Sequence, residues 1–474
     1  MAFNSLANLL LSKRSDSIVA FELNNDNDIN WKQFLADVKY LILLIKNKPC
    51  QSVAICCDNS YLFSVAFFAS LYTNKKVVLP GNHQPAMLLS LSSEFDLLID
   101  DGIVEETLKA NLADNSFIRL SMSMLSHSLT NECVSFDFYP LNLSAIEILL
   151  FTSGSTGLPK AIKKSLLMLD AEIDALEKQF GSVLEQSRIV STVSHQHIYG
   201  LLFRVLWPLS AERPFAMTDI IYPEQVIQNG TKEHTLISSP ALLKRLQHEI
   251  IKGDYCSVFS SGGPLSSDAS DSCKECLNST AIEVFGSTET GGIGFRQQHT
   301  SNSLWSFFSE VKVKNIEGCL ALSSPWLSEK LDKSLSDEYS CDGYYQTNDL
   351  CELLENHQFK LKGRVDSIVK IEEKRVSLVE VELHLDALPW ISESAVIVIT
   401  EEHRVTLGAL LTLTTEGDVE LSTLGKGRFW IKLRQSLRDW VEPVAIPRHF
   451  RIVTSIPMNK QGKRLTQEIA ELFK

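Results

Sequence analysis

Short apolar runs alternate with longer helix-like segments along the first part of the chain. SVAICC at 52–57 predicts a buried strand, and SYLFSVAFFASLY at 60–72 predicts an apolar helix. KKVVLP at 75–80 and FDLLID at 95–100 predict two further strands. Alternation of strands and helices is typical of parallel or mixed sheets layered with helices, so the sequence predicts an α/β fold.

The pattern changes near residue 364. Before it, the strands of YCSVFSSGGPLSS and TAIEVFGSTETGG each end in a glycine-rich turn, where ligands of open α/β sheets bind. After it, shorter strand-like and helix-like segments predict a small α+β unit. We therefore expect an N-terminal domain over 1–363 and a C-terminal domain over 364–474.

Composition and charge narrow the class of protein. The 474 residues predict more than one domain, and 44% hydrophobic with 22% charged residues is an ordinary globular balance. A net charge of −13 disfavours nucleic acid as a partner. No apolar run reaches the ~20 residues of a membrane span, and the start MAFNSLANLLLSKRSD predicts an amphipathic helix instead of a secretory signal.

The ten cysteines have no regular spacing, which favours structural or free thiols over zinc or disulfides. A cytoplasmic location is the prediction that follows.

The segment 149–165, LLFTSGSTGLPKAIKKS, carries the strongest chemical signal. An apolar strand runs into a loop of small residues, whose backbone N–H groups and hydroxyls can converge on phosphate oxygens, and a helix-like segment follows. A Walker A loop needs its lysine directly after a glycine, whereas Lys160 follows Pro159. A flexible linker would also fit the composition, and the flanking strand and helix disfavour it.

This loop resembles the phosphate loop of the adenylate-forming superfamily, and further motifs of that family follow in order. The resemblance spans residues 30 to 470 and implies a large N-terminal domain with a small, mobile C-terminal lid. It implies ATP and Mg²⁺ as cofactors. The implied phosphate-binding residues are Thr152, Ser153, Gly154, Ser155, Thr156, Gly157 and Lys160.

Three more motifs imply the rest of the nucleotide site. SSGGPLS resembles the turn at the adenine pocket, with Gly262 and Gly263. VFGSTETGG resembles the motif in which Phe285 and Gly286 lie at adenine, Thr288 contacts the α-phosphate and Glu289 holds Mg²⁺. GYYQTNDL implies that Asp349 binds the ribose hydroxyls, with Asn348 in place of the usual glycine.

The C-terminal motifs imply the parts of a lid. Within LKGRVDSIVKIEEKRVSLVEVE, Arg364 matches a ribose contact, Asp366 the hinge and Arg375 the second arginine of the signature. In PMNKQGKR, Lys463 matches the catalytic lysine that stabilises charge as the carboxylate attacks the α-phosphate.

VSHQHIYGLLF resembles the acyl-site motif of the family. It places His195, His197, Tyr199 and Gly200 in the substrate pocket, with His197 also counted among the catalytic candidates. Either ring could instead be a satisfied core histidine. No carboxylate occurs from Ser191 to Ser210, where amino-acid-activating relatives place an Asp, so an uncharged acyl or aryl acid is expected.

The implied reaction converts a carboxylic acid and Mg·ATP into an acyl-adenylate and pyrophosphate, then transfers the acyl group to a thiol. The acceptor stays open between an acyl carrier protein, which we favour, and coenzyme A. Glu373 replaces the glycine that lines the pantetheine tunnel in thioester-forming relatives. A non-catalytic nucleotide-binding scaffold and a luciferase-like oxygenase are competing functions of a different class.

KGRFWIKLRQSLR at 426–438 is basic and contains no acid. An amphipathic basic helix there could dock an acidic carrier protein by complementary charge, or it could be an ordinary solvated face.

Overall fold

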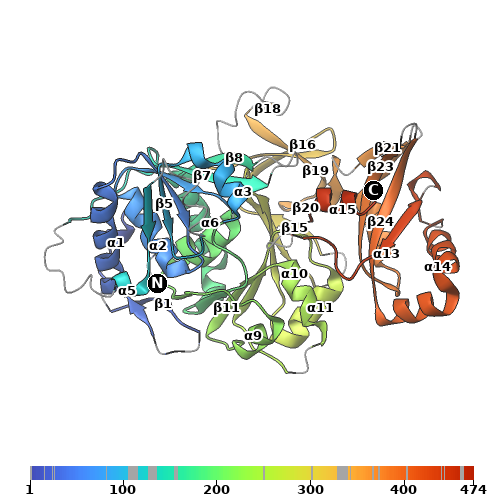
Figure 1. The fold of residues 1–474 in the computed structure, drawn as a ribbon, viewed down its shortest axis with the longest axis horizontal. Coiled ribbons are helices and arrows are strands. Elements are labelled where there is room, and N and C mark those ends of the chain that lie inside the picture. The colour runs from blue at the N-terminus through green and yellow to red at the C-terminus, as the bar shows by residue number, and fades with distance from the viewer. Residues whose placement is uncertain are drawn as a thin grey trace. The chain divides into compact units, whose positions relative to one another are not determined.

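The computed structural model describes most of the chain. The described residues are 3–14, 16–23, 25, 27–81, 83–104, 116–125, 136–153, 159–248, 251–299, 303–327, 340–341, 343–365, 368–371, 374–401, 404–438, 440–441, 443–458 and 464–473. They form two compact units (Figure 1). Unit 1 comprises Met1–Lys312 with Ser323–Glu338, and unit 2 comprises Val313–Leu322 with Tyr339–Lys474.

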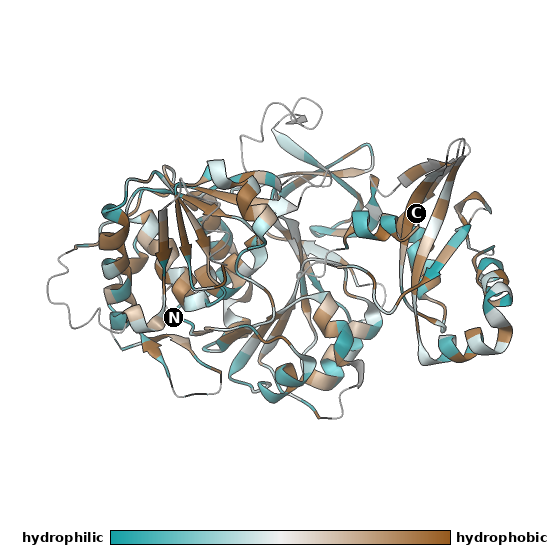
Figure 2. Ribbon diagram, viewed as in Figure 1, coloured by the Kyte–Doolittle hydropathy of each residue, from teal (hydrophilic) through white to brown (hydrophobic). Residues whose placement is uncertain are grey.

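One sheet of unit 1 has the strand order β6-β5-β3-β4-β7-β8 and is parallel except at its β7–β8 edge. Its strands are β3 (Ser52–Cys56), β4 (Lys76–Leu79), β5 (Leu97–Asp100), β6 (Ser116–Arg119), β7 (Glu147–Ser153) and β8 (Pro159–Ser165). The central strands are hydrophobic along their length (Figure 2), as strands covered on both faces must be.

The helix α2 (Ser60–Leu71) explains why the sequence around it is apolar on all sides. Every residue of α2 is buried, and the helix contacts both α1 (Trp31–Lys46) and the strands β3 and β4 (Figure 1). Its N-terminus is capped by Asn59, whose side chain accepts from two backbone N–H groups of the first turn. A helix that is hydrophobic all round belongs in a core, and α2 confirms the prediction made from its sequence.

The larger sheet of unit 1 has the order β15-β14-β13-β12-β11-β9-β10-β1-β2. Its strands are β1 (Ile18–Phe21), β2 (Ile29–Asn30), β9 (Arg188–Ser191), β10 (Phe215–Ala216), β11 (His234–Ser238), β12 (Ser257–Ser260), β13 (Ile282–Ser287), β14 (Gly291–Gln297) and β15 (Trp305–Phe307). The strands β9, β11, β12 and β13 are parallel neighbours, so their carboxyl ends meet along one edge.

The remaining helices of unit 1 connect these strands. They are α3 (Pro85–Ser90), α5 (Met122–Leu125), α6 (Leu166–Leu184), α7 (Ile198–Gly200), the π-helical η3 (Leu201–Leu206), α8 (Trp207–Ser210), α9 (Pro223–Gln228), α10 (Pro240–Leu243) and α11 (Ser267–Leu277), with 3-10 turns η1 (Leu9–Leu11), η2 (Ser92–Glu94) and η4 (Lys244–His248).

The amphipathic helix predicted at the N-terminus is wrong. Residues 3–14 contain only the short turn η1. The carboxylate of Asp170 in α6 accepts from the hydroxyl of Ser5 at 2.8 Å and from the backbone N–H of Leu6 at 2.6 Å. These contacts hold residues 5 and 6 against the helix α6. They compete with the backbone hydrogen bonds that a helix over this segment would make.

Unit 2 contains a meander and a small α+β layer. The meander has the order β16-β17-β19-β20 with β18 on β19, and a hairpin of β21 and β22 follows it in sequence. The bounds are β16 (Lys312–Ile316), β17 (Cys319–Ser323), β18 (Ser340–Cys341), β19 (Tyr344–Leu353), β20 (Gln358–Arg364), β21 (Ile368–Ile371) and β22 (Lys374–Ser377).

The α+β layer packs helices on both faces of a three-stranded sheet. It comprises α13 (Leu378–Asp386), β23 (Ile391–Glu401), β24 (Arg404–Leu413), α14 (Thr415–Arg438), the turn η6 (Pro443–Ala445), β25 (His449–Ile452) and α15 (Thr466–Glu471). Helices α13 and α14 share one core with β23 and β24, while α15 packs on the other face. The α/β class and the division into a large and a small part are confirmed, and the boundary at residue 364 stays a prediction.

Candidate active site

The predicted phosphate loop is the connection of an edge hairpin. The strands β7 and β8 pair antiparallel, with Thr152 opposite Lys160 and Ser153 opposite Pro159. The loop itself, with the predicted Gly154, Ser155, Thr156 and Gly157, lies outside the described residues. What the structure adds is the base of that loop, a ladder that fixes where Thr152 and Lys160 stand.

Lys160 meets the predicted metal-binding glutamate. Its Nζ lies 2.8 Å from Oε1 of Glu289, which stands in the turn between β13 and β14, directly after Thr288. Burial by itself would raise the pKa of Glu289, but the hydrogen bond and charge of Lys160 outweigh it and hold the pKa below 4.5. Two residues that are 129 positions apart in sequence thus form one charged pair at the phosphate loop.

The glycine-rich turn and the aromatic of the predicted adenine pocket lie on neighbouring strands. Ser261 follows β12 and donates its hydroxyl to the backbone oxygen of Val284 in β13 at 2.8 Å. Gly262 comes next with φ +95°, a backbone region that L side chains rarely adopt, and Gly263 is exposed. In β13, Glu283 is paired with Ser260 of β12, and Phe285 lies two residues further along the strand. The ring of Phe285 packs on the ring of Trp305, with 5.6 Å between the ring centroids.

Gly286 is required by close packing. A Cβ there would stand 2.2 Å from the backbone oxygen of Gly291 across the hairpin. Any side chain would therefore push apart the two strands that carry the Glu289 turn.

In unit 2, the two predicted ribose-binding residues face each other. Asp349 on β19 is paired with Arg364 on β20, and their side chains join at 3.1 Å. Arg375 lies in β22, opposite Lys370. The hinge Asp366, the lysine Lys463 and the departure at Glu373 lie outside the described residues.

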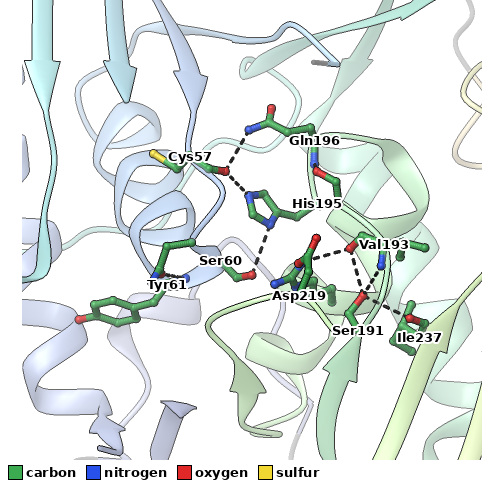
Figure 3. A network of polar contacts seen from close by, with 12 residues as sticks. Cys57, Ser60, Tyr61, Ser191, Val193, His195, Gln196, Asp219 and Ile237 are labelled. Carbon is green, nitrogen blue, oxygen red and sulfur yellow. Dashed lines mark hydrogen bonds and ion pairs between the residues drawn. The ribbon is translucent and has the colours of Figure 1, made fainter. Parts of the chain in front are cut away.

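His195 is buried in a network of polar contacts (Figure 3), and its predicted place in the substrate pocket stays a prediction. Its Nε2 is 2.7 Å from the backbone oxygen of Cys57, its Nδ1 is 3.3 Å from the hydroxyl of Ser60, and its ring packs on Phe63 at 4.2 Å. Burial, and then the charge of Arg204, holds the pKa of His195 well below 6.5. The ring ties the segment after β9 to the segment between β3 and α2.

His197 differs from His195 because one of its ring nitrogens has no hydrogen-bond partner among the described residues. Among the side chains the structure describes, none gives a hydrogen bond to its buried Nε2. Burial lowers the pKa of His197 to about 4, so the ring is neutral at pH 7. A Cβ on Gly81 would stand 3.5 Å from the His197 ring and 2.5 Å from the backbone oxygen of Phe151 in β7. The 3.5 Å distance to His197 is an ordinary contact, so the glycine is required by the close approach of residue 81 to the backbone of β7.

Tyr199 and Gly200 complete the predicted pocket motif within α7. Tyr199 packs on Phe203 at 4.8 Å, and burial raises the pKa of its hydroxyl well above 10. A Cβ on Gly200 would stand 2.1 Å from the backbone oxygen of Ser194, so the turn at His195 requires a glycine here.

Lys164 is a further residue of the site region that none of the motifs indicates. It lies in β8 four residues after Lys160, and its side chain is buried, whereas Lys163 is exposed. The alternation of exposed and buried positions in PKAIKKS could have revealed it, because Lys164 shares the inward face with Ile162.

Comparisons with known proteins identify the family and the fold. A family model described as AMP-binding enzyme matches residues 12–319. Probable CoA ligase CCL5 of Humulus lupulus is 26% identical over 364 residues, covering 70% of this chain and 65% of that protein. Acetyl-coenzyme A synthetase 2 of Kluyveromyces lactis is 26% identical over 392 residues, covering 70% of this chain and 56% of that protein.

The crystal structure of ATP-bound MatB from Rhodopseudomonas palustris has the same fold. It superimposes with a TM-score of 0.84 at 17% identity, covering 100% of this chain and 99% of that chain. The alignments with the two curated relatives span less than two thirds of their lengths. Within the described part of the chain, no helix is long and apolar enough to cross a membrane.

Proposed function

The chain belongs to the AMP-binding enzyme family, and from that premise we propose that it is an ATP-dependent carboxylic acid ligase. In the first step the acid attacks the α-phosphate of Mg·ATP, giving an acyl- or aryl-adenylate and pyrophosphate. In the second step a phosphopantetheine thiol takes the acyl group and AMP leaves. A carboxylate is a poor electrophile, and adenylation gives it a good leaving group.

The pair of Lys160 and Glu289 carries this proposal. A lysine beside a phosphate loop would contact phosphate oxygens, and a carboxylate is tolerated beside them only when a cation lies between. Glu289 offers one partly buried carboxylate, which suits Mg²⁺ because that ion takes one or two carboxylates plus the phosphates of its nucleotide. Mg²⁺, when bound, neutralises charge on the phosphates. In the structure, Lys160 supplies the positive partner of Glu289.

The remaining predicted residues complete the site in this proposal. Thr152 and Thr288 donate to phosphate oxygens, while Phe285, Gly262 and Gly263 line the adenine. Asp349 and Arg364 hold the ribose. Lys463 stabilises the charge that develops at the α-phosphate, and Asp366 is the hinge of the lid.

The acid is proposed to be uncharged apart from its reacting carboxylate. His197 is neutral at pH 7, and no Asp or Glu occurs from Ser191 to Ser210 to hold an ammonium group. Tyr199, Phe203 and the neutral ring of His197 favour an aryl or hydroxylated acid. Relatives described as CoA ligases and acetyl-CoA synthetases support the class of reaction.

Two acceptors fit the second step. Coenzyme A is supported by the names of the relatives. An acyl carrier protein is supported by α14, where Lys426, Arg428 and Arg438 are exposed near Ile431, which is 55% exposed. Trp440, 67% exposed, follows that helix and would add an apolar contact. We favour the carrier protein, because an acidic partner complements this face by charge, and we place the enzyme in the cytoplasm.

Pyrophosphate exchange into ATP tests the first step. The panel would contain short, medium and long fatty acids and benzoic, hydroxybenzoic and cinnamic acids. Exchange with one class would support the ligase and identify its acid. Binding of Mg·ATP without exchange for any acid would refute it and favour a nucleotide-binding scaffold.

Acyl transfer to coenzyme A and to a holo carrier protein tests the acceptor. Arg428→Glu combined with Arg438→Glu should slow transfer to the carrier protein and leave transfer to coenzyme A unchanged, which provides the internal control. Equal slowing of both reactions, or of neither, would contradict docking on α14.

A further inference from the structure

The ammonium group of Lys164 is fully buried within unit 1. The side chain has no exposed surface, and its Nζ donates to the backbone oxygen of Glu289 at 2.8 Å and to that of Trp326 at 2.7 Å. Glu289 is therefore held at two points by one strand. Lys160 binds its carboxylate, and Lys164 binds its carbonyl.

A buried charge is costly, and the surroundings of Lys164 offset part of that cost. Burial lowers the pKa of Lys164 to about 8, against the charges of Glu172 and Glu289, which favour the protonated form. Glu172 in α6 is also buried, and its Oε1 accepts from the backbone N–H of Gly292 at 2.6 Å. The other oxygen, Oε2, has no hydrogen-bond partner among the described residues.

Lys164, Glu172 and Trp326 contact the hairpin that carries the turn 287–290 on the side facing the core. Gly291 has φ +64°, and a Cβ there would stand 2.4 Å from Cδ1 of Trp326 and 2.7 Å from Oε2 of Glu172. Trp326 in turn donates its Nε1 to the backbone oxygen of Gly292 at 3.0 Å. The hairpin therefore contacts the lysine, the glutamate and the tryptophan directly.

Burial of a lysine here is not needed for hydrophobic packing, since an apolar side chain of similar volume would fill the space at less cost. The ammonium instead orients the surrounding backbone, because it donates hydrogen bonds to two carbonyl oxygens from segments far apart in sequence. We propose that Lys164 is a positioning residue of adenylation, holding the turn 287–290 so that Glu289 faces Lys160 and the phosphates of Mg·ATP. This inference rests on the proposed function.

Three variants separate positioning from stability. Lys164→Met removes both hydrogen bonds but leaves Glu172 buried without its cation, which destabilises the fold. Lys164→Met with Glu172→Gln removes both charges and should recover the melting temperature. Lys163→Met is the matched control, because the neighbouring Lys163 is exposed and pairs with Glu147 on the surface at 2.8 Å.

Calorimetric binding of Mg·ATP and of AMP, together with the KM for Mg·ATP in pyrophosphate exchange, gives the readout. We expect the double variant to melt like the unaltered chain yet to bind Mg·ATP about tenfold more weakly, which corresponds to about 1.4 kcal/mol. AMP keeps the α-phosphate that Thr288 would contact but lacks the β- and γ-phosphates, so its affinity should fall less than that of Mg·ATP. Lys163→Met should match the unaltered chain throughout.

The outcomes distinguish the two proposals. A double variant that recovers both stability and Mg·ATP affinity would show that Lys164 is only a structural group. Equal weakening of Mg·ATP and AMP binding would also overturn the positioning role. If the unaltered chain binds Mg·ATP but exchanges no pyrophosphate, the ligase proposal fails, while selective weakening in the double variant still supports Lys164. Failure of the unaltered chain to bind Mg·ATP would overturn both.

Discussion

Replacing His197 by asparagine should weaken the acid sensitivity of the fold. The structure places Nε2 of His197 in a buried position with no hydrogen-bond donor among the residues described, and burial lowers the pKa of the ring to about 4. An imidazole that stays neutral in the folded state gains its proton when the chain unfolds. Acid therefore favours the unfolded state at this position, and asparagine, which does not titrate, removes the effect.

The size of the effect follows from the two pKa values. The ordinary value is 6.5 and the folded value about 4, a difference of about 2.5. Each unit of pKa difference corresponds to ~1.36 kcal/mol, so the full contribution to the free energy of unfolding is about 3 kcal/mol. Stability falls as the pH decreases from 6.5 towards 4, because in this range the unfolded chain binds more protons than the folded chain. Between pH 7.5 and 5, about 2 kcal/mol is lost through His197.

Two measurements check this value. In ¹³C-labelled histidine NMR, the resonance that His197→Asn removes should not titrate until the pH falls below 5. In urea unfolding, the loss of stability between pH 7.5 and 5 should be about 2 kcal/mol smaller in the variant. The exposed His299, changed to asparagine, is the matched control. A His197 midpoint between 6 and 7, or equal acid sensitivity of variant and unaltered chain, would refute the reasoning.

Three further perturbations test a proposed phosphate contact, a closely packed glycine and a buried ion pair. Lys160→Met should lower pyrophosphate exchange at least tenfold by removing a charge at the phosphates, and an unchanged rate would exclude that contact. Gly81→Ala should lower the melting temperature more than Gly102→Ala, since both positions have positive φ but only the first would clash, and equal losses would mean that the clash relaxes freely. Glu283→Gln should cost about 3 kcal/mol in urea unfolding, because the buried carboxylate accepts two hydrogen bonds from Arg296 at 2.7 and 3.0 Å, and a loss below 1 kcal/mol would contradict a strong pair.

Much of the fold could be predicted because hydrophobic patterns are local. The all-apolar helix α2 and the buried strand β3 follow directly from SYLFSVAFFASLY and SVAIC. The order of motifs likewise predicts that Lys160 and Glu289 lie close together, and that they serve one ligand stays a prediction. The structure brings these two side chains together across 129 residues.

Other features depend on tertiary contacts that no local pattern encodes. The alternation in PKAIKKS can place Lys164 on the same face as Ile162, but the carbonyls that its ammonium meets belong to segments far away in sequence. The two histidines of HQHIYG look alike in sequence. Only the structure shows that His195 is saturated by Cys57 and Ser60 while His197 is not.

The ladder at the base of the phosphate loop also limits how this segment can change in length. Side chains alternate along β8, so a slip of one residue against β7 would move Lys160 and Lys164 to the opposite face of the sheet and put Ala161 and Lys163 in their place. A deletion that the ladder absorbs by slipping would therefore displace Lys160, the proposed phosphate contact, and the buried Lys164 in one event. In laboratory evolution, insertions or deletions should survive only where Thr152 stays paired with Lys160. The length of the loop is therefore constrained independently of which residues the loop contains.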